Sequence, residues 1–174
     1  MMKRALFLDR DGILNRVVFR KGRVSSPWVM AEFQLIPEAV TCVQKARQAG
    51  FLTIVITNQP DISRALMSLD ELEKMHQFLY AVMPLTAIEV CVSADDCDPR
   101  RKPNPGMLVE SAQRWNVSLK DSFFLGDSEK DVEAGRRAGV STILLQTEYN
   151  GPIHGMADDQ CAHLCELDPL WTEA

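Results

Sequence analysis

The chain has 174 residues, of which 46% are hydrophobic and 25% are charged. This length and balance suit one compact globular domain and leave no room for a second full domain. The 24 acidic residues outnumber the 19 Lys and Arg, and the net charge of -5 without a long basic run argues against duplex nucleic acid as the main partner.

Short apolar runs alternate with amphipathic stretches from one end of the chain to the other, which is the pattern of a parallel sheet covered by helices. In chain order we predict a strand at Ala5–Leu8, a helix from Pro37 to a stop at Gly50, a strand at Leu52–Thr57, a helix at Leu69–Val82, a strand at Ile88–Val92, a helix at Pro105–Trp115, a strand at Ser122–Leu125, a helix at Glu129–Ala138 and a strand at Thr142–Leu145. Each strand after the first follows a crossover, so we expect an α/β fold with a doubly wound, mostly parallel sheet.

Two segments stand outside this alternation. Residues 16–33 show neither period, contain Gly22 and Pro27, and are longer than most connections, so we expect a loop at the active site. Residues 151–174 are expected to form a C-terminal extension of a single domain spanning 1–174.

The location of the protein can also be predicted. Residues 1–8 pass from basic residues into an apolar run that is too short for a secretion signal. No stretch approaches the roughly 20 apolar residues that span a bilayer. The five cysteines are an odd number and do not form a dense disulfide framework. We therefore expect a soluble cytoplasmic protein with reduced thiols and no membrane contact.

Polar side chains follow four of the predicted strands. Asp9 and Asp11 follow the first strand, Thr57 and Asn58 the second, Lys102 lies in the loop after the third, and Asp127 follows the fourth. The carboxyl ends of parallel strands lie along one edge of a sheet, where ligands bind, so these residues can converge although they are far apart in sequence. Together they predict a phosphoryl-transfer site.

Each of these residue types has a role in such chemistry. Asp9 and Asp127 could hold a hard divalent cation such as Mg²⁺. Asp9 could also attack phosphorus, and Asp11 is placed to protonate the leaving oxygen and then to activate water. Lys102 would neutralise the phosphoryl charge, and the Thr57 hydroxyl would hydrogen-bond the phosphoryl oxygens.

Simpler interpretations exist for single motifs. Asp9 to Gly12 could be a solvated turn in which Gly12 permits the close bend, and Gly126 to Ser128 could be only a helix cap. The recurrence of polar residues at four strand ends favours a site.

These residues resemble the four motifs of the haloacid dehalogenase superfamily of aspartyl-phosphate phosphatases, in order over roughly residues 5–147. The matching residues are Asp9, Arg10, Asp11, Gly12, Leu14 and Asn15, then Thr57, Asn58 and Gln59, then Arg101, Lys102 and Pro103, and finally Gly126, Asp127 and Asp131. Within the superfamily, the motifs are most similar to those of the D-glycero-D-manno-heptose 1,7-bisphosphate phosphatases and the related histidinol-phosphate phosphatases.

The resemblance implies a Rossmann-like haloacid dehalogenase fold with no large cap domain, in which Asp9 is the nucleophile and Asp11 the acid and base. It further implies that Mg²⁺ is bound by Asp9, by the backbone carbonyl of Asp11 and by Asp127, with Asp131 outside the direct ligands. The residues expected to contact substrate are Gly12, Asn15, Asn58, Gln59, Arg64 and Arg101.

The sequence departs from that subfamily at a metal-binding loop. The subfamily usually carries a cysteine and histidine loop before its Arg-Lys-Pro, whereas here Cys91 is followed by Ser93 and Cys97 by Pro99. A structural zinc ion needs four ligands in a closed site. We therefore expect no structural zinc.

The leading hypothesis is a Mg²⁺-dependent phosphomonoesterase that acts on a small sugar phosphate, such as a heptose bisphosphate. The alternatives are a histidinol-phosphate phosphatase, a nucleic-acid end phosphatase, and a module that binds phosphate ligands without turnover. Ser128 stands where the family usually has a basic residue, and Lys130 follows two positions later, which leaves the substrate preference open.

Overall fold

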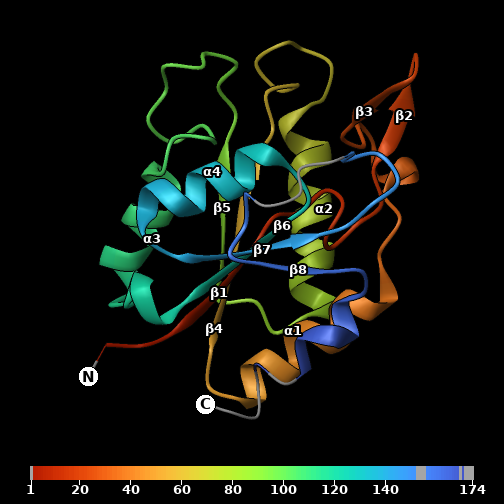
Figure 1. The fold of residues 1–174 in the computed structure, drawn as a ribbon. Helices are drawn as coiled ribbons and strands as arrows, with labels where there is room; N and C mark the ends of the chain where they lie inside the picture. The colour runs from red at the N-terminus through yellow and green to blue at the C-terminus, as the bar shows by residue number, and fades with distance from the viewer. Residues whose placement is uncertain (1, 152–155, 169, 171–174) are drawn as a thin grey trace.

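The computed structural model describes residues 2–151, 156–168 and 170, and over these residues its centre is a six-stranded sheet in the order β5-β4-β1-β6-β7-β8 (Figure 1). The strands are β1 Ala5–Leu8, β4 Leu52–Asn58, β5 Ala87–Cys91, β6 Phe123–Gly126, β7 Ser141–Leu145 and β8 Asp159–Cys161. All neighbouring strands of this sheet pair in parallel. The predicted doubly wound α/β fold is thereby confirmed.

Four helices connect these strands. They are α1 Pro37–Gln48, α2 Leu69–Val82, α3 Gly106–Trp115 and α4 Glu129–Ala138, with short 3₁₀ turns η1 Met30–Glu32, η2 Leu119–Asp121 and η3 Leu164–Leu167. Local signals set their ends: Ser68 caps α2 by accepting from the Glu71 N–H, and Ser128 and Asp131 form a capping box at α4. In the described ranges, every helix lacks the length and apolar character needed to cross a bilayer.

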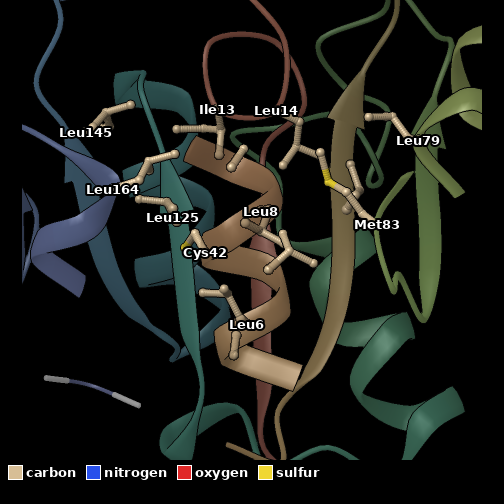
Figure 2. Packing of buried hydrophobic residues seen from close by; sticks show 14 of the residues in the cluster. Leu6, Leu8, Ile13, Leu14, Cys42, Leu79, Met83, Leu125, Leu145 and Leu164 are labelled. Atoms are coloured by element: carbon tan, nitrogen blue, oxygen red, sulfur yellow. The ribbon is translucent and has the colours of Figure 1, made fainter. Parts of the chain in front are cut away.

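Helices cover both faces of the sheet. Leu6 and Leu8 of β1 pack in the cluster that contains α1 and α2, and Figure 2 shows them beside Cys42 and Leu125. The alternate residue Phe7 packs in the second cluster, with α3 and α4. The central strand is therefore apolar on both sides, as expected for a parallel sheet between two helical layers.

Residues 16–33 contain regular structure that the sequence analysis did not predict. β2 Val18–Arg20 and β3 Arg23–Ser25 pair antiparallel and form a hairpin. Lys21 and Gly22 form its turn with φ of 50° and 75°, the conformation of a two-residue type I′ turn. The Gly at the second turn position was the available signal.

The predicted C-terminal extension, 151–174, includes residues 152–155, 169 and 171–174, which lie outside the described residues. Its described part supplies β8, which pairs with β7, and η3, whose Leu164 and Leu167 are buried in the cluster around α1.

The strand order decides where polar loops meet. β1 lies between β4 and β6, so the chain continues to opposite sides of β1 and creates a switch point at the carboxyl ends of β1 and β6. Asp9 follows β1 there, and its N–H donates to the Leu125 carbonyl of β6 at 2.9 Å. The β2–β3 hairpin and the loops after β4 and β5 rise at this end of the molecule (Figure 1, top).

Candidate active site

Three buried carboxylates meet at the switch point. One oxygen of each of Asp9, Asp127 and Asp131 lies within 4.8 Å of the others. Lys102, from the loop between β5 and α3, is only 3% exposed and reaches into this group. Its Nζ donates to Asp9 Oδ1 at 2.7 Å, to Asp131 Oδ1 at 2.6 Å and to the Ile56 carbonyl at 2.8 Å. One ammonium therefore contacts two of the three carboxylates.

The pKa values of these groups depend on their burial and on the charges of their close neighbours. Burial, and next the charge of Asp131, raise the pKa of Asp9 to about 7 against the opposing effect of Lys102. Burial, and next the charge of Asp9, raise the pKa of Asp127. Burial alone would lower the pKa of Lys102, but Asp131 and Asp9 outweigh it and raise that pKa, so Lys102 stays protonated.

The donor set fits a divalent cation. Three carboxylates face one ammonium, so the cluster is short of positive charge, and hard cations such as Mg²⁺ prefer carboxylate oxygens. Asp131 is the least available of the three, because Lys102 engages its Oδ1 while the Ser128 N–H and hydroxyl engage its Oδ2. Asp9 and Asp127 have more of their acceptor capacity free.

The loop after β1 approaches Asp127 closely. Gly12 has φ of 92°, and a Cβ there would lie 1.9 Å from Asp127 Oδ2 and 2.6 Å from the Tyr149 hydroxyl. Only glycine fits this position, for both conformational and steric reasons. Tyr149 and Asn150, in the loop after β7, were missed by sequence reasoning, because they match no motif and follow no periodic pattern.

Asp11 lies in a cage of donors from three segments. Its carboxylate accepts from Arg10 Nε at 3.1 Å and Nη2 at 3.0 Å, and from Asn15 Nδ2, Ser26 Oγ and Gln59 Nε2, each at 2.8 Å. Burial would raise the pKa of Asp11, but the Arg10 charge and the side-chain hydrogen bonds outweigh burial and lower it. The carboxylate is therefore held in its ionised form.

The residues after β4 hold neighbouring side chains in place. Asn58 Oδ1 accepts from the Lys102 N–H at 3.1 Å, and Asn58 Nδ2 donates to the Lys102 carbonyl at 3.0 Å, which fixes the loop that carries the lysine. The Thr57 hydroxyl oxygen accepts from Gln59 Nε2 at 2.9 Å.

The predicted arginines also lie at the site. Arg64 pairs with Asp61 at 3.1 Å, and Arg101 donates to Asp96 and to the Ser93 carbonyl. Both arginines line the open cavity at this end of the sheet.

An open cavity of about 1040 Å³ lies above these groups. Of the sequence-predicted residues, it is lined by Asp9, Asp11, Asn58, Arg64, Arg101, Lys102, Asp127 and Asp131. Gly12, Asn15, Thr57 and Gln59 are not among its lining residues. The β2–β3 hairpin forms another wall, with Lys21 and Arg23 among its cations. Segments distant in the sequence thus enclose one space.

A buried arginine and histidine lie behind Asp11. Arg10 is fully buried, and its Nη1 lies 3.4 Å from His76 Nε2 of α2. Because a guanidinium only donates, this nitrogen of His76 is the unprotonated acceptor. Burial and then the Arg10 charge lower the pKa of His76 to about 4, against the opposing charge of Asp11.

This environment predicts an acid-sensitive contribution to stability. The His76 pKa falls from 6.5 to about 4 on folding, so between these values the unfolded chain binds the extra proton and the folded state loses stability as the pH falls. His76→Gln keeps an acceptor for Arg10 but does not titrate. We expect its free energy of unfolding in urea to decline less between pH 7 and pH 4, by up to about 3 kcal/mol. Parallel profiles for the two proteins would contradict the assignment.

In the described part of the chain, side chains that could hold a metal ion together gather at one place. The acidic cluster at the switch point is the one group there of three or more such residues within reach of a common ion. Cys91 is buried and Cys97 exposed, and neither belongs to such a group.

Comparisons with known proteins agree with this geometry. A family model of haloacid dehalogenase-like hydrolases matches residues 4–139. A D-glycero-D-manno-heptose-1,7-bisphosphate 7-phosphatase from Chlorobaculum tepidum is 34% identical over 165 residues, covering 84% of this chain and 80% of that protein. A D-glycero-beta-D-manno-heptose-1,7-bisphosphate 7-phosphatase from Pseudomonas putida is 35% identical over 149 residues, covering 82% of each.

A solved structure is similar over nearly its whole length. The D,D-heptose 1,7-bisphosphate phosphatase from B. bronchiseptica, complexed with magnesium and phosphate, superposes with a TM-score of 0.84 at 27% identity, covering 98% of this chain and 99% of that one. The chain belongs to the haloacid dehalogenase-like hydrolase family. Within it, the protein is a phosphoric monoester hydrolase, similar in sequence to the heptose bisphosphate phosphatases.

Proposed function

We propose that the protein is a Mg²⁺-dependent phosphomonoesterase that hydrolyses a small sugar phosphate through a phosphoryl group carried on Asp9. The observation that supports this most is the 2.7 Å contact of Lys102 Nζ with Asp9 Oδ1 inside the cluster of buried carboxylates. The ammonium favours the ionised carboxylate and occupies Oδ1. The other oxygen, Oδ2, is then the one that attacks phosphorus.

The proposed reaction has two steps. First, a bond forms between Asp9 and phosphorus, the bond from phosphorus to the sugar oxygen breaks, and Asp11 gives that oxygen a proton. Second, water attacks phosphorus, Asp11 takes a proton from it, and the acyl phosphate bond breaks to release inorganic phosphate. The donors around Asp11 favour its ionised form, which suits the second step. For the first step the carboxyl has to release a donor and take up a proton.

The Mg²⁺ of this proposal would be held by Asp9, by the backbone carbonyl of Asp11 and by Asp127. Asp131 would stay outside the direct ligands, because both of its oxygens already accept hydrogen bonds. When bound, the cation would neutralise negative charge on the phosphoryl oxygens and on the attacking carboxylate. The Thr57 hydroxyl would donate its proton to a phosphoryl oxygen.

We propose D-glycero-D-manno-heptose 1,7-bisphosphate or a similar sugar bisphosphate as the substrate. The names of the relatives support it, and so do the cations of the cavity. Lys21, Arg23 and Lys130 line the cavity, and none of them forms an ion pair or side-chain hydrogen bond within the described residues. They are available for a second phosphate, and the segment 16–33 would shield the substrate as an active-site loop.

We also propose that residues 1–174 act as one phosphatase domain in the cytoplasm. The five cysteines are all free, which suits a reducing compartment. The partner of the domain is then a small soluble phosphate ester, in preference to a nucleic acid or a membrane surface.

Phosphate release from a panel of sugar, amino-alcohol and nucleotide phosphates tests the function. We expect release from the heptose bisphosphate with Mg²⁺ and none with a chelator.

Lys21→Gln should raise KM for the bisphosphate about tenfold and leave KM for the corresponding 7-monophosphate unchanged, because a charge-assisted hydrogen bond contributes about 1.5–3 kcal/mol.

The control for this experiment is Lys120→Gln, since Lys120 is exposed and lies outside the cavity. Equal KM effects on both substrates would contradict the role of Lys21. Binding of phosphate esters without any turnover across the panel would instead favour a catalytically silent binding module.

A further inference from the structure

Tyr149 touches the acidic cluster from a loop that carries no recognised motif. Its hydroxyl lies 2.5 Å from Asp127 Oδ2, and the carboxylate accepts the hydrogen bond. The next residue, Asn150, donates from Nδ2 to the Asp127 carbonyl at 3.0 Å and to the Leu145 carbonyl at 2.7 Å. The loop after β7 therefore holds both the side chain and the backbone of Asp127.

The phenol has little freedom at this position. Besides Asp127, its hydroxyl faces the backbone of Gly12 so closely that a Cβ there would lie 2.6 Å away. On its other side, the ring meets Phe19 of the β2–β3 hairpin edge to face, with the ring centroids 6.0 Å apart and the planes at 72°. Phe19 is largely exposed and does not line the cavity, whereas Tyr149 does, so the edge-to-face contact joins the hairpin to a residue of the cavity wall.

The hydrogen bond also gives the two oxygens of the Asp127 carboxylate different roles. With Oδ2 of Asp127 engaged by the hydroxyl, Oδ1 is the oxygen left to meet a cation. A ligating carboxylate that is held by a hydrogen bond has one orientation fixed before the metal arrives, and outer partners of this kind typically contribute 10–100-fold to metal affinity.

We propose that Tyr149 is a positioning residue that orients the Asp127 carboxylate for a divalent cation, with its ring held in place by Phe19 of the hairpin. The inference rests on the proposed function, since it assumes that Asp127 is a cation ligand. Tyr149 lies in the loop after β7, outside the four motifs, so a fifth segment of the chain contributes a residue to the site.

The test is a calorimetric titration of each protein with Mg²⁺ alone, without substrate. Tyr149→Phe keeps the ring and its contact with Phe19 but removes the hydroxyl. We expect it to bind Mg²⁺ about 10–100-fold more weakly, and to recover most of its kcat when Mg²⁺ is raised to saturation. Phe19→Ala should weaken Mg²⁺ binding by a smaller, several-fold factor, because the ring loses one support while the hydroxyl remains.

Tyr80→Phe provides the matched control, since Tyr80 is the other tyrosine of the chain and is exposed on α2. Melting temperatures in chelator establish that each variant is folded. Wild-type Mg²⁺ affinity in Tyr149→Phe would overturn the inference and leave the proposed function standing. Failure of the unaltered protein to bind Mg²⁺ would overturn both.

Discussion

Asp9→Asn should abolish phosphate release, by more than about 10³-fold in kcat, and should leave the fold intact. An amide cannot form the acyl phosphate, so the proposed first step is lost. The amide oxygen still accepts from Lys102 Nζ, which holds Asp9 Oδ1 at 2.7 Å in the unaltered protein. The substitution also removes a buried charge that burial and Asp131 oppose, as the rise in the Asp9 pKa to about 7 indicates. The melting temperature at pH 8 should therefore stay the same or rise.

The measurement combines phosphate release, thermal unfolding and acid-quenched mass spectrometry. The unaltered protein should yield a phosphorylated peptide that contains residue 9, and Asp9→Asn should yield none. Asp70→Asn is the control, because Asp70 is exposed at the start of α2, and it should keep full activity. Near wild-type hydrolysis by Asp9→Asn would show that another residue is the nucleophile.

Of the variants proposed for this protein, Lys102→Met should have the largest effect on the free energy of unfolding. The side chain is buried, and its ammonium contacts Asp9, Asp131 and the Ile56 carbonyl. Methionine has a similar length but no charge, so the buried carboxylates lose their common cation. Removing one partner of a buried ion pair typically costs about 3–5 kcal/mol. We expect a loss of that size in the free energy of unfolding, together with loss of activity.

Urea denaturation in chelator at pH 7.5 and at pH 5.5 checks this. Lys102 opposes the rise in the pKa of Asp9 and of Asp127, so without the ammonium these two pKa values rise further. The folded state then binds protons more readily, and part of the loss should disappear at the lower pH. Lys45→Met is the control, because Lys45 pairs with Asp168 at the surface and such pairs contribute about 0–1 kcal/mol. A loss no larger than that of Lys45→Met would refute the buried-charge argument.

The secondary structure of the sheet and its four helices could be predicted because local patterns specify them. Buried parallel strands are continuous apolar runs. The helix predicted at Leu69–Val82 has the same bounds in the structure, because its apolar period lies within the segment and its cap, Ser68, directly precedes it. β8 could not be predicted in this way. Its three residues, Asp159–Cys161, carry no apolar period, and only pairing with β7 makes them a strand.

The candidate site also contains residues that the sequence predicts and contacts that it does not. Asp9 and Asp127 could be selected because each directly follows an apolar strand, and the parallel topology brings such ends together. The partners of Asp11 could be recognised only in part. Asn15 and Gln59 belong to motifs, whereas Ser26 comes from the segment predicted as a loop, and its hydrogen bond depends on where that segment lies.

The sequence by itself determined the fold class, because apolar periodicity and caps act over a few neighbouring positions. The residues at the strand ends indicated the family through their resemblance to its motifs. Only the tertiary structure decided which of these side chains form ion pairs and hydrogen bonds with one another. Lys102 meets Asp9 across 93 positions, Arg10 meets His76 across 66, and Tyr149 meets Asp127 across 22. These contacts depend on strand order, register and loop placement, and the side chains that make them interact only after the sheet has brought their segments together.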